Sequence, residues 1–242
     1  MCFTMAIFSS PEKLEKRFNA TFPTPSSFTQ NPVVSGFDHK RSPVITANDP
    51  GHFQFFHWGL IPAWVKEKER AKEMMNRTLN ARAETVFEKA SFREAIRQRR
   101  CIVPCDGFYE WRHINGKKIP YFIRLPKERP MALAGIWEAW HFADKTYRTF
   151  SILTTEANPL MAKIHNTKQR MPVILPTENE KTWLDPTLDQ TRISEISVPY
   201  TKKLDAFTVR GPKRGEPAKQ ALQPYDYPEL ANERGEGQGE LF

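Results

Sequence analysis

The second residue of the chain, Cys2, has the most distinctive potential chemistry in the sequence. If the initiator Met1 is removed, Cys2 becomes an N-terminal cysteine whose α-amine and thiol lie on adjacent carbons. Such an amine has a pKa of about 7.7–8.0 and is partly neutral at pH 7, so it can attack an aldehyde to form an imine. The neighbouring thiol can then close a five-membered thiazolidine ring. The alternative is a cysteine without a chemical role at this position, since thiol reactivity depends on its environment.

Glu110 is a candidate general acid or base because it lies in an aromatic segment, Gly107-Phe-Tyr-Glu-Trp111. If this segment is a strand, its alternation places Phe108 and Glu110 on one face and Tyr109 and Trp111 on the other. A carboxylate beside Phe108 on an apolar face should have a raised pKa, which suits proton transfer near neutral pH. The alternative is a glutamate on an edge strand that faces water.

His165 is a second candidate proton carrier, at the end of a short predicted helix and before the segment Asn166-Thr-Lys-Gln-Arg170. The six histidines include no pair at the i, i+4 spacing of a helical zinc site. Cys101 and Cys105 lack a second cysteine pair that could complete a zinc site. We therefore expect no metal centre and no other cofactor.

Asn80 and Arg82 lie two residues apart in the segment Leu79-Asn-Ala-Arg-Ala-Glu-Thr85. On an extended chain both side chains point the same way. An amide and a guanidinium side by side could hold a sugar hydroxyl and a phosphate. The alternative is a helix cap followed by surface residues.

The chain is basic, with 36 Lys and Arg against 28 Asp and Glu and a formal net charge of +8. Such an excess suits a polyanionic partner, nucleic acid first, although many basic proteins bind none. Arg77, Arg82 and Arg170 lie close in sequence to the candidate site residues and are expected to contact DNA.

Tryptophans could stack on unpaired bases, and Trp64 and Trp111 are the candidates. Trp64 follows Pro62-Ala63 and precedes a charged run, so we expect it to be exposed. Trp58 and Trp183 are expected to lie in the core instead.

The elements that must position these residues can be predicted from periodicity and turn signals. Asn115-Gly116 indicates a hairpin between two strands. The predicted strands occupy residues 53–60, 101–103, 108–113, 119–125, 131–137, 149–154, 171–175 and 206–210.

Three helix starts are predicted from capping residues. Ser91 with Glu94 and Thr177 with Glu180 form capping boxes, and Asn158 precedes Pro159. The charged run 66–77 is expected to form a short helix or a mobile loop.

The 242 residues are therefore predicted to form one α+β domain, residues 1–225, with mostly antiparallel strands. Residues 226–242 are acidic and glycine-rich, and we expect a flexible C-terminal tail.

The cellular location can be predicted from cysteine usage and from the apolar runs. Three cysteines are too few for a disulfide framework and indicate free thiols. The start of the chain lacks the pattern of a secretory signal, and no apolar run approaches the ~20 residues of a membrane helix. We expect a cytoplasmic protein that does not bind membranes.

Six segments stand in a shared order along nearly the whole chain. They are Met1-Cys2, residues 58–64 (WGLIPAW), 80–85 (NARAET), 100–111 (RCIVPCDGFYEW), 134–138 (AGIWE), and Ile164-His165 with 170–175 (RMPVIL). Together these segments resemble the SRAP family, whose members process abasic sites in DNA. The resemblance implies a single domain with a curved or barrel-like sheet core and short flanking helices.

The resemblance also implies a mechanism. The Cys2 amine would condense with the aldehyde of an abasic deoxyribose, and the thiol would close a thiazolidine that links protein and DNA. Glu110 would move protons, His165 would assist ring opening or imine steps, and Asn80 would orient the sugar or the Cys2 amine. Arg82 would grip a flanking phosphate. The implied partner is single-stranded DNA that contains abasic sites, such as the DNA at replication forks in the nucleoid. The resemblance also implies that the protein binds this DNA as a monomer.

Exposure of Cys2, by self-processing or by an aminopeptidase, explains the family's peptidase label.

Two other functions remain open from the sequence. An N-terminal-nucleophile amidohydrolase also begins with a catalytic cysteine whose α-amine serves as base. Glutaminase-type members continue with Gly-Ile, whereas this chain has Phe3-Thr4. A non-catalytic single-strand binder would use only basic and stacking residues and would form no covalent adduct.

Overall fold

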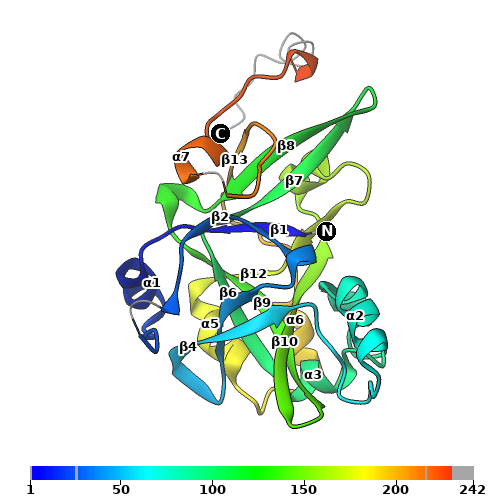
Figure 1. The fold of residues 1–242 in the computed structure, drawn as a ribbon. Coiled ribbons are helices and arrows are strands. Elements are labelled where there is room, and N and C mark those ends of the chain that lie inside the picture. The colour runs from blue at the N-terminus through cyan, green and yellow to red at the C-terminus, as the bar shows by residue number, and fades with distance from the viewer. Residues whose placement is uncertain (1, 25–26, 216, 231–242) are drawn as a thin grey trace.

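The computed structural model describes residues 2–24, 27–215 and 217–230, and it combines an open antiparallel sheet with a closed β-barrel. The open sheet has five strands in the order β13-β8-β7-β1-β2 and lies across one end of the barrel (Figure 1). Its strands are β1 (Thr4–Ile7), β2 (Asn31–Ser35), β7 (Gly107–Ile114), β8 (Lys117–Arg124) and β13 (Asp205–Thr208).

The barrel closes because β10 pairs with β9 on one side and with β4 on the other, in the ring β10-β4-β3-β6-β9. The β10–β4 pair is parallel and the others are antiparallel, so the barrel is mixed. The ring strands are β3 (Arg41–Thr46), β4 (Asp49–Trp58), β6 (Arg100–Cys105), β9 (Met131–Phe142) and β10 (Lys145–Glu156).

Three short strands extend the barrel and bring Asn80 and Arg170 to its edge. β5 (Asn80–Arg82) and β11 (Arg170–Pro172) both pair with β10, and β12 (Ile174–Leu175) pairs with β9. The structure therefore confirms the predicted α+β fold with mostly antiparallel strands around a barrel-like core.

The helices are short and lie around the strands. They are α1 (Pro11–Phe18), α2 (Lys68–Arg77), α3 (Arg93–Gln98), α4 (Pro159–Ile164), α5 (Thr177–Leu184), α6 (Gln190–Ile196) and α7 (Ala218–Ala221). In the part of the chain that the structure describes, no helix has the length and apolar character to cross a membrane.

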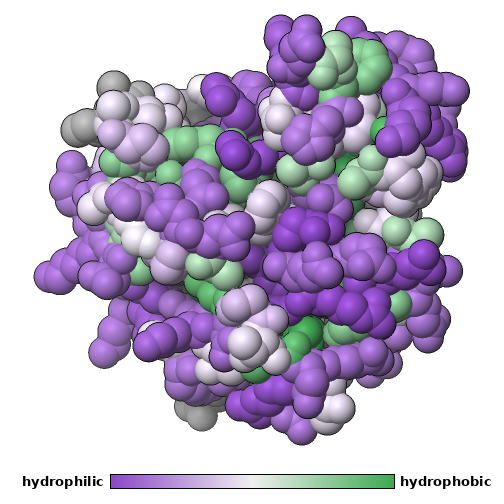
Figure 2. Space-filling model, turned by 90° about the horizontal axis from the view of Figure 1, so that it is seen from below, coloured by the Kyte–Doolittle hydropathy of each residue, from purple (hydrophilic) through white to green (hydrophobic). Residues whose placement is uncertain are grey.

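Apolar side chains from both sheets form one main core. Trp58 and Phe150 stack inside it with ring centroids 6.0 Å apart, and Trp183 is also fully buried, as predicted. The face of the molecule seen in Figure 2 is mostly hydrophilic, with apolar residues in small separate patches.

Two of the three predicted helix caps are wrong. α3 begins at Arg93, and its N-cap is Phe92. The backbone N–H groups of Phe92 and Arg93 both donate to the Lys89 carbonyl, so Ser91 lies in a turn before the helix. In α5 the N-cap is Pro176, and the Thr177 hydroxyl instead accepts a hydrogen bond from Arg129. A side-chain cap is one of several ways to satisfy the first-turn N–H groups, which is why the pattern misleads here.

The third predicted cap is confirmed, and so is the predicted hairpin. The Asn158 side chain accepts a hydrogen bond from the Met161 backbone N–H at 2.9 Å at the start of α4. Asn115 and Gly116 both have positive φ, 48° and 77°, between β7 and β8, as a tight hairpin requires.

The C-terminal part of the chain is described as far as Leu230, which is buried, and the Tyr227 hydroxyl donates to the Val209 carbonyl at 3.0 Å. Residues 231–242, which make up most of the predicted tail, lie outside the described residues.

Gly107, the first residue of β7, is expected to tolerate no side chain. A Cβ there would overlap the Phe122 ring and lie 2.5 Å from the Ile123 carbonyl oxygen, so backbone would have to move. We expect Gly107→Ala to lower the free energy of unfolding by about 1–3 kcal/mol in urea titrations. Gly51→Ala is the control, because a Cβ there meets nothing within 4 Å, and its change should stay within about 0.5 kcal/mol. Equal effects of the two substitutions would contradict this account of β7.

Candidate active site

Cys2 lies directly before β1, the strand held between β2 and β7 in the open sheet. Within β1, Thr4 is opposite Tyr109 of β7, and the next residue back, Phe3, accepts a hydrogen bond from the Gly36 N–H at 2.8 Å. In the full-length chain, from which residue 1 has not been removed, the Cys2 side chain is buried. Its place in the fold is therefore set by main-chain pairing on both sides of β1.

Asn80 fixes Cys2 from the barrel side. Its Nδ2 donates to the Cys2 carbonyl at 2.9 Å, and its Oδ1 is buried without a hydrogen-bond partner among the described residues. Asn80 begins β5, so the extended conformation is confirmed and the alternative of a helix cap is wrong. An acceptor in this position can receive a hydrogen bond from an amine or a sugar hydroxyl.

Glu110 lies on the buried face of β7, in contact with the main core. Its side chain is almost fully buried, and Phe108 belongs to the same core, whereas Tyr109 and Trp111 pack in a separate cluster on the other face. The predicted alternation is confirmed. Burial of the carboxylate raises the pKa of Glu110 to about 7, so both protonation states are populated at neutral pH.

The Cys2 thiol and the Glu110 carboxylate are close enough to influence each other. Burial raises the pKa of the Cys2 thiol well above its usual range, and the charge of Glu110 raises it further. The thiol is therefore neutral in this environment, and it needs a proton acceptor before it can act as a nucleophile.

His165 completes the group from the end of α4. Its Nε2 lies 4.0 Å from Oε2 of Glu110, and the residue is buried. Burial lowers the pKa of His165, so its ring is neutral at pH 7. The neighbouring Asn166 exchanges two hydrogen bonds with the main chain of His113, at 3.0 and 2.8 Å, and so pins this loop to β7.

The structure thus brings together the four residues that the sequence indicated for chemistry: Cys2, Asn80, Glu110 and His165. They come from the start of the chain, β5, β7 and the end of α4, which only the tertiary structure makes neighbours. A thiol, a titrating carboxylate, a neutral imidazole and an amide are groups that can together carry out a covalent reaction at a carbonyl.

Three of the residues expected to bind DNA are exposed. Trp64 is 51% exposed, and its indole N–H donates to the Ala90 carbonyl at 3.3 Å. The loop that carries it is held by Val65, which is buried in a small cluster with α2. Arg77 ends α2 and Arg82 ends β5, and both side chains are exposed.

The structure places the other two differently. Arg170 is buried and forms an ion pair with Glu84 at 2.7 Å, so its guanidinium does not face outward. Trp111 is only partly exposed and packs with Tyr109 and Phe122 on the face of β7 opposite Glu110. Neither side chain is presented to solvent as Trp64 and Arg82 are.

Phe37 is an exposed aromatic residue near Cys2 that the sequence did not predict. Its side chain is 53% exposed, and its ring centroid lies 5.2 Å from that of Phe3. The two meet through the hydrogen bond between Gly36 and Phe3 described above. No local pattern marks Phe37, because its exposure depends on the pairing of β1 with β2.

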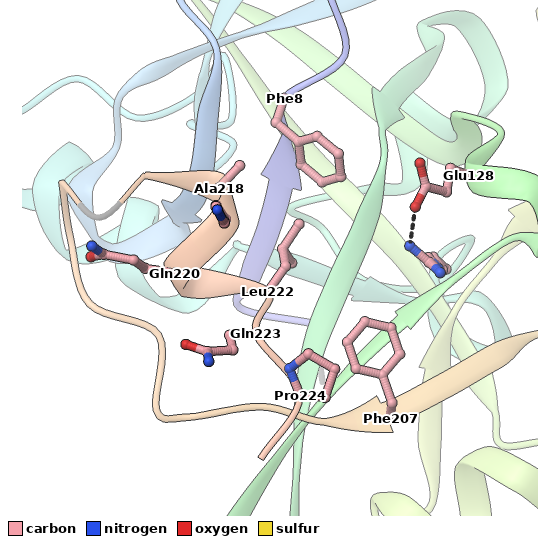
Figure 3. Close-up of a pocket in the computed structure, with 10 residues that line it drawn as sticks. Phe8, Glu128, Phe207, Ala218, Gln220, Leu222, Gln223 and Pro224 are labelled. Carbon is pink, nitrogen blue, oxygen red and sulfur yellow. Dashed lines mark hydrogen bonds and ion pairs between the residues drawn. The ribbon is translucent and has the colours of Figure 1, made fainter.

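A pocket of about 710 Å³ lies elsewhere, on the open sheet beside α7 (Figure 3). Phe8, Phe207 and Leu222 form its apolar floor, and an ion pair between Arg124 and Glu128 lies at its edge. It shares no residue with the candidate active site.

Comparisons with known proteins identify relatives over most of the chain. The chain is 34% identical over 225 residues to the abasic site processing protein YoqW of Bacillus subtilis. The aligned region covers 90% of this chain and 97% of the relative. It is 46% identical over 157 residues to YoaM of the same organism, covering 63% of this chain and 66% of the relative. A crystal structure of a Bacteroides thetaiotaomicron protein superposes with a TM-score of 0.87 at 38% identity, covering 93% of this chain and all of that one.

The family model for SOS response associated peptidase (SRAP) matches residues 1–211. These residues include all four members of the candidate active site and both sheets that hold them. The chain belongs to the SRAP family.

Proposed function

We propose that this protein processes abasic sites in single-stranded DNA by covalent capture of the sugar through Cys2. The contact of Asn80 with Cys2, the influence of Glu110 on the Cys2 thiol and the contact of His165 with Glu110 support this proposal most directly, because two titratable side chains and an amide then lie near Cys2. Two relatives, YoqW and YoaM, are named abasic site processing proteins. The reaction needs a free α-amine at Cys2, and therefore removal of Met1, by the protein itself or by an aminopeptidase.

The proposed reaction has three steps. The neutral amine of Cys2 attacks C1′ of the ring-opened sugar and forms a carbinolamine. Loss of the hydroxyl group as water leaves an iminium ion. The sulfur then adds to C1′ as the thiol proton leaves, which closes the thiazolidine and neutralises the nitrogen. The adduct is the sum of protein and abasic DNA minus one water.

Glu110 and His165 are the proton carriers in this scheme. Glu110, with a pKa of about 7, can protonate the departing hydroxyl and accept the thiol proton, whose removal is otherwise unfavourable because burial raises the pKa of Cys2. His165 is neutral and offers Nε2 as an acceptor when the sugar ring opens. Asn80 holds the Cys2 main chain and presents its free oxygen to the amine or the sugar.

The exposed aromatic and basic side chains are proposed to hold the strand on either side of the abasic sugar. Trp64 and Phe37 can stack on flanking bases, and Arg77 and Arg82 can contact phosphates. An abasic nucleotide has no base to unstack, so its entry into a pocket costs less than the flipping of an intact nucleotide.

The direct test is to incubate the purified full chain with a single strand that contains one abasic site, made by uracil excision. We expect a band that survives heat and SDS and whose mass equals protein without Met1 plus DNA minus one water. Peptide mapping should place the link at Cys2. A product that appears only after borohydride reduction, or one located on a lysine, would overturn the proposal.

The same preparation distinguishes the two other functions. Hydrolysis of glutamine without any DNA adduct would indicate an amidohydrolase. Salt-sensitive binding of intact and abasic strands with equal affinity and no adduct would indicate a non-covalent single-strand binder.

We expect Arg82→Ala to weaken binding of single strands by removing one phosphate contact. Each such contact contributes a slope of about −0.7 to log K against log salt for single strands, so the slope should become shallower by about 0.7 in fluorescence titrations. Lys13→Ala is the control, because α1 lies at the left edge of the molecule in Figure 1, away from the start of β1 at the N label. Identical salt slopes for Arg82→Ala and the wild type would remove Arg82 from the interface.

A further inference from the structure

Arg170 and Glu84 form an ion pair with two hydrogen bonds beside the candidate active site. Nη1 of Arg170 donates to Oε1 of Glu84 at 2.7 Å, and Nη2 donates to Oε2 at 2.8 Å. Nη2 also donates to the Thr154 carbonyl at 2.8 Å, and the Arg170 side chain is only 11% exposed. A guanidinium that meets a carboxylate through two parallel bonds has little orientational freedom.

The main chain of Arg170 holds the imidazole ring of His165. Nδ1 of His165 lies 3.0 Å from the Arg170 carbonyl oxygen and 3.3 Å from the Arg170 nitrogen. With the ring proton on Nδ1, the shorter contact is a hydrogen bond donated to the carbonyl and Nε2 carries the lone pair; with the proton on Nε2, Nδ1 accepts from the Arg170 N–H. With either tautomer the Arg170 main chain holds Nδ1, and Nε2 faces Glu110 at 4.0 Å.

Glu84 is joined to the segment that holds Cys2. It lies in a short 3-10 helix, Ala83–Thr85, directly after β5, whose first residue Asn80 donates to the Cys2 carbonyl. β5 and β11 flank the same part of β10, since Thr154 is opposite Arg82 on one side and Pro172 on the other. The Arg170–Glu84 pair therefore crosses β10 and joins the segment that holds the nucleophile to the segment that holds the imidazole.

We propose that Arg170 and Glu84 are positioning residues, which set Nε2 of His165 relative to Cys2 and Glu110. The inference rests on the proposed function and extends it to residues that do not touch the reacting atoms. Burial would raise the pKa of Glu84, but hydrogen bonds and charge from Arg170 outweigh it and hold that pKa below its usual range. The carboxylate is thus ionised at neutral pH, and the pair is present when the reaction occurs.

Glu84→Gln is the first test, because it keeps the side-chain shape and removes the charge that orients Arg170. We expect the rate of adduct formation on an abasic single strand to fall roughly tenfold or more, because small misplacements of reacting groups cause large losses of rate. Affinity for the same strand with a reduced abasic sugar, which has no aldehyde, should change less than about twofold. Glu88→Gln is the matched control, four residues along and exposed, and it should keep the wild-type rate.

The decisive measurement combines Glu84→Gln with His165→Ala. If Glu84 acts through His165, the double variant will form adduct as fast as His165→Ala alone, so the effects will not multiply. Multiplied rate losses would show that Glu84 acts independently and would overturn the inference. So would a wild-type rate in His165→Ala, although an adduct that still formed at Cys2 would leave the proposed function intact.

Arg170→Lys provides a second route to the same answer, since an ammonium group cannot form two parallel bonds with a carboxylate. As a single substitution it should slow adduct formation, and in combination with His165→Ala it should have no further effect.

Nitrogen NMR of the His165 ring gives a readout of position that does not depend on activity. We expect a single tautomer in the wild type and a mixture of tautomers in both Glu84→Gln and Arg170→Lys. Unchanged ring spectra in both variants would contradict the inference.

Discussion

Replacement of Cys2 by alanine will abolish the heat-stable adduct with abasic single strands. The α-amine remains in Cys2→Ala and can still form an imine, but no sulfur is available to close the ring, and imines hydrolyse. We expect the yield of stable adduct to fall roughly a thousandfold or more, as when a catalytic nucleophile is removed. Denaturing gels with a labelled strand measure this yield, and borohydride should trap the residual imine in the variant.

Cys101→Ala is the control for the loss of a buried thiol. Cys101 is also a buried free cysteine, and burial likewise raises the pKa of its thiol, but it lies within the barrel in β6. Its adduct yield should match that of the wild type at a temperature where both proteins are folded. An undiminished stable adduct in Cys2→Ala would move the chemistry to another residue and overturn the proposed function.

Replacement of Glu110 by glutamine will slow adduct formation without preventing it. Glutamine keeps the shape of the side chain but cannot give or take a proton, so the steps that release water and deprotonate the buried thiol lose their catalyst. Proton transfer by a positioned group contributes typically 10²–10⁴-fold, and we expect a loss of about a hundredfold or more. Single-turnover time courses measure it, and equal rates in wild type and variant would remove Glu110 from the mechanism.

The same substitution has a distinct effect on stability, because burial raises the pKa of Glu110 from 4.5 to about 7 in the folded protein. A carboxyl group whose pKa is raised by folding stabilises the folded state fully below pH 4.5, and this contribution disappears as the pH rises through 7. The shift corresponds to about 3 kcal/mol. Between pH 4.5 and 8, the free energy of unfolding of Glu110→Gln should therefore rise by about this amount relative to the wild type.

Chemical denaturation at the two pH values tests this expectation. Glu156→Gln is the control, because Glu156 lies at the exposed end of β10, and its replacement should change the free energy of unfolding by less than about 0.5 kcal/mol at each pH. A Glu110→Gln variant whose difference from the wild type is the same at both pH values would show that the carboxyl group is not buried as described.

Much of the site could be predicted from the sequence because its main features are local. The alternation of residues 107–111 was sufficient to place Glu110 with Phe108 on the buried face, since successive side chains of a strand point to opposite faces. Asn158 and Pro159 marked the start of the helix that ends at His165. The exposure of Trp64 followed from its place between a proline turn and a charged run.

The two capping boxes show where local patterns fail. A serine or threonine followed three residues later by glutamate satisfies first-turn N–H groups only where the chain enters the helix at that residue. Here the backbone before α3 already turns on the Lys89 carbonyl, and Pro176 precedes Thr177. Neighbouring backbone decided both helix starts.

Arg170 shows the same limit for function. From its position near His165 it could equally contact a phosphate or a carboxylate, and its carboxylate partner, Glu84, is 86 residues earlier in the chain. Only the pairing of β5 and β11 with β10 brings the two together. Phe37 likewise lies near Cys2 only because β2 pairs with β1.

The sequence by itself determined which groups could react: a second-position cysteine, a carboxylate on an apolar strand face, a histidine at a helix end and an amide on an extended segment. The tertiary structure decided how near these groups lie and which charges face inward. The physical reason is the distance along the chain over which each effect acts. Strand alternation and helix capping act between residues a few positions apart, whereas pKa shifts and ion pairs depend on burial and on partners that only the closed barrel and the sheet beside it bring together.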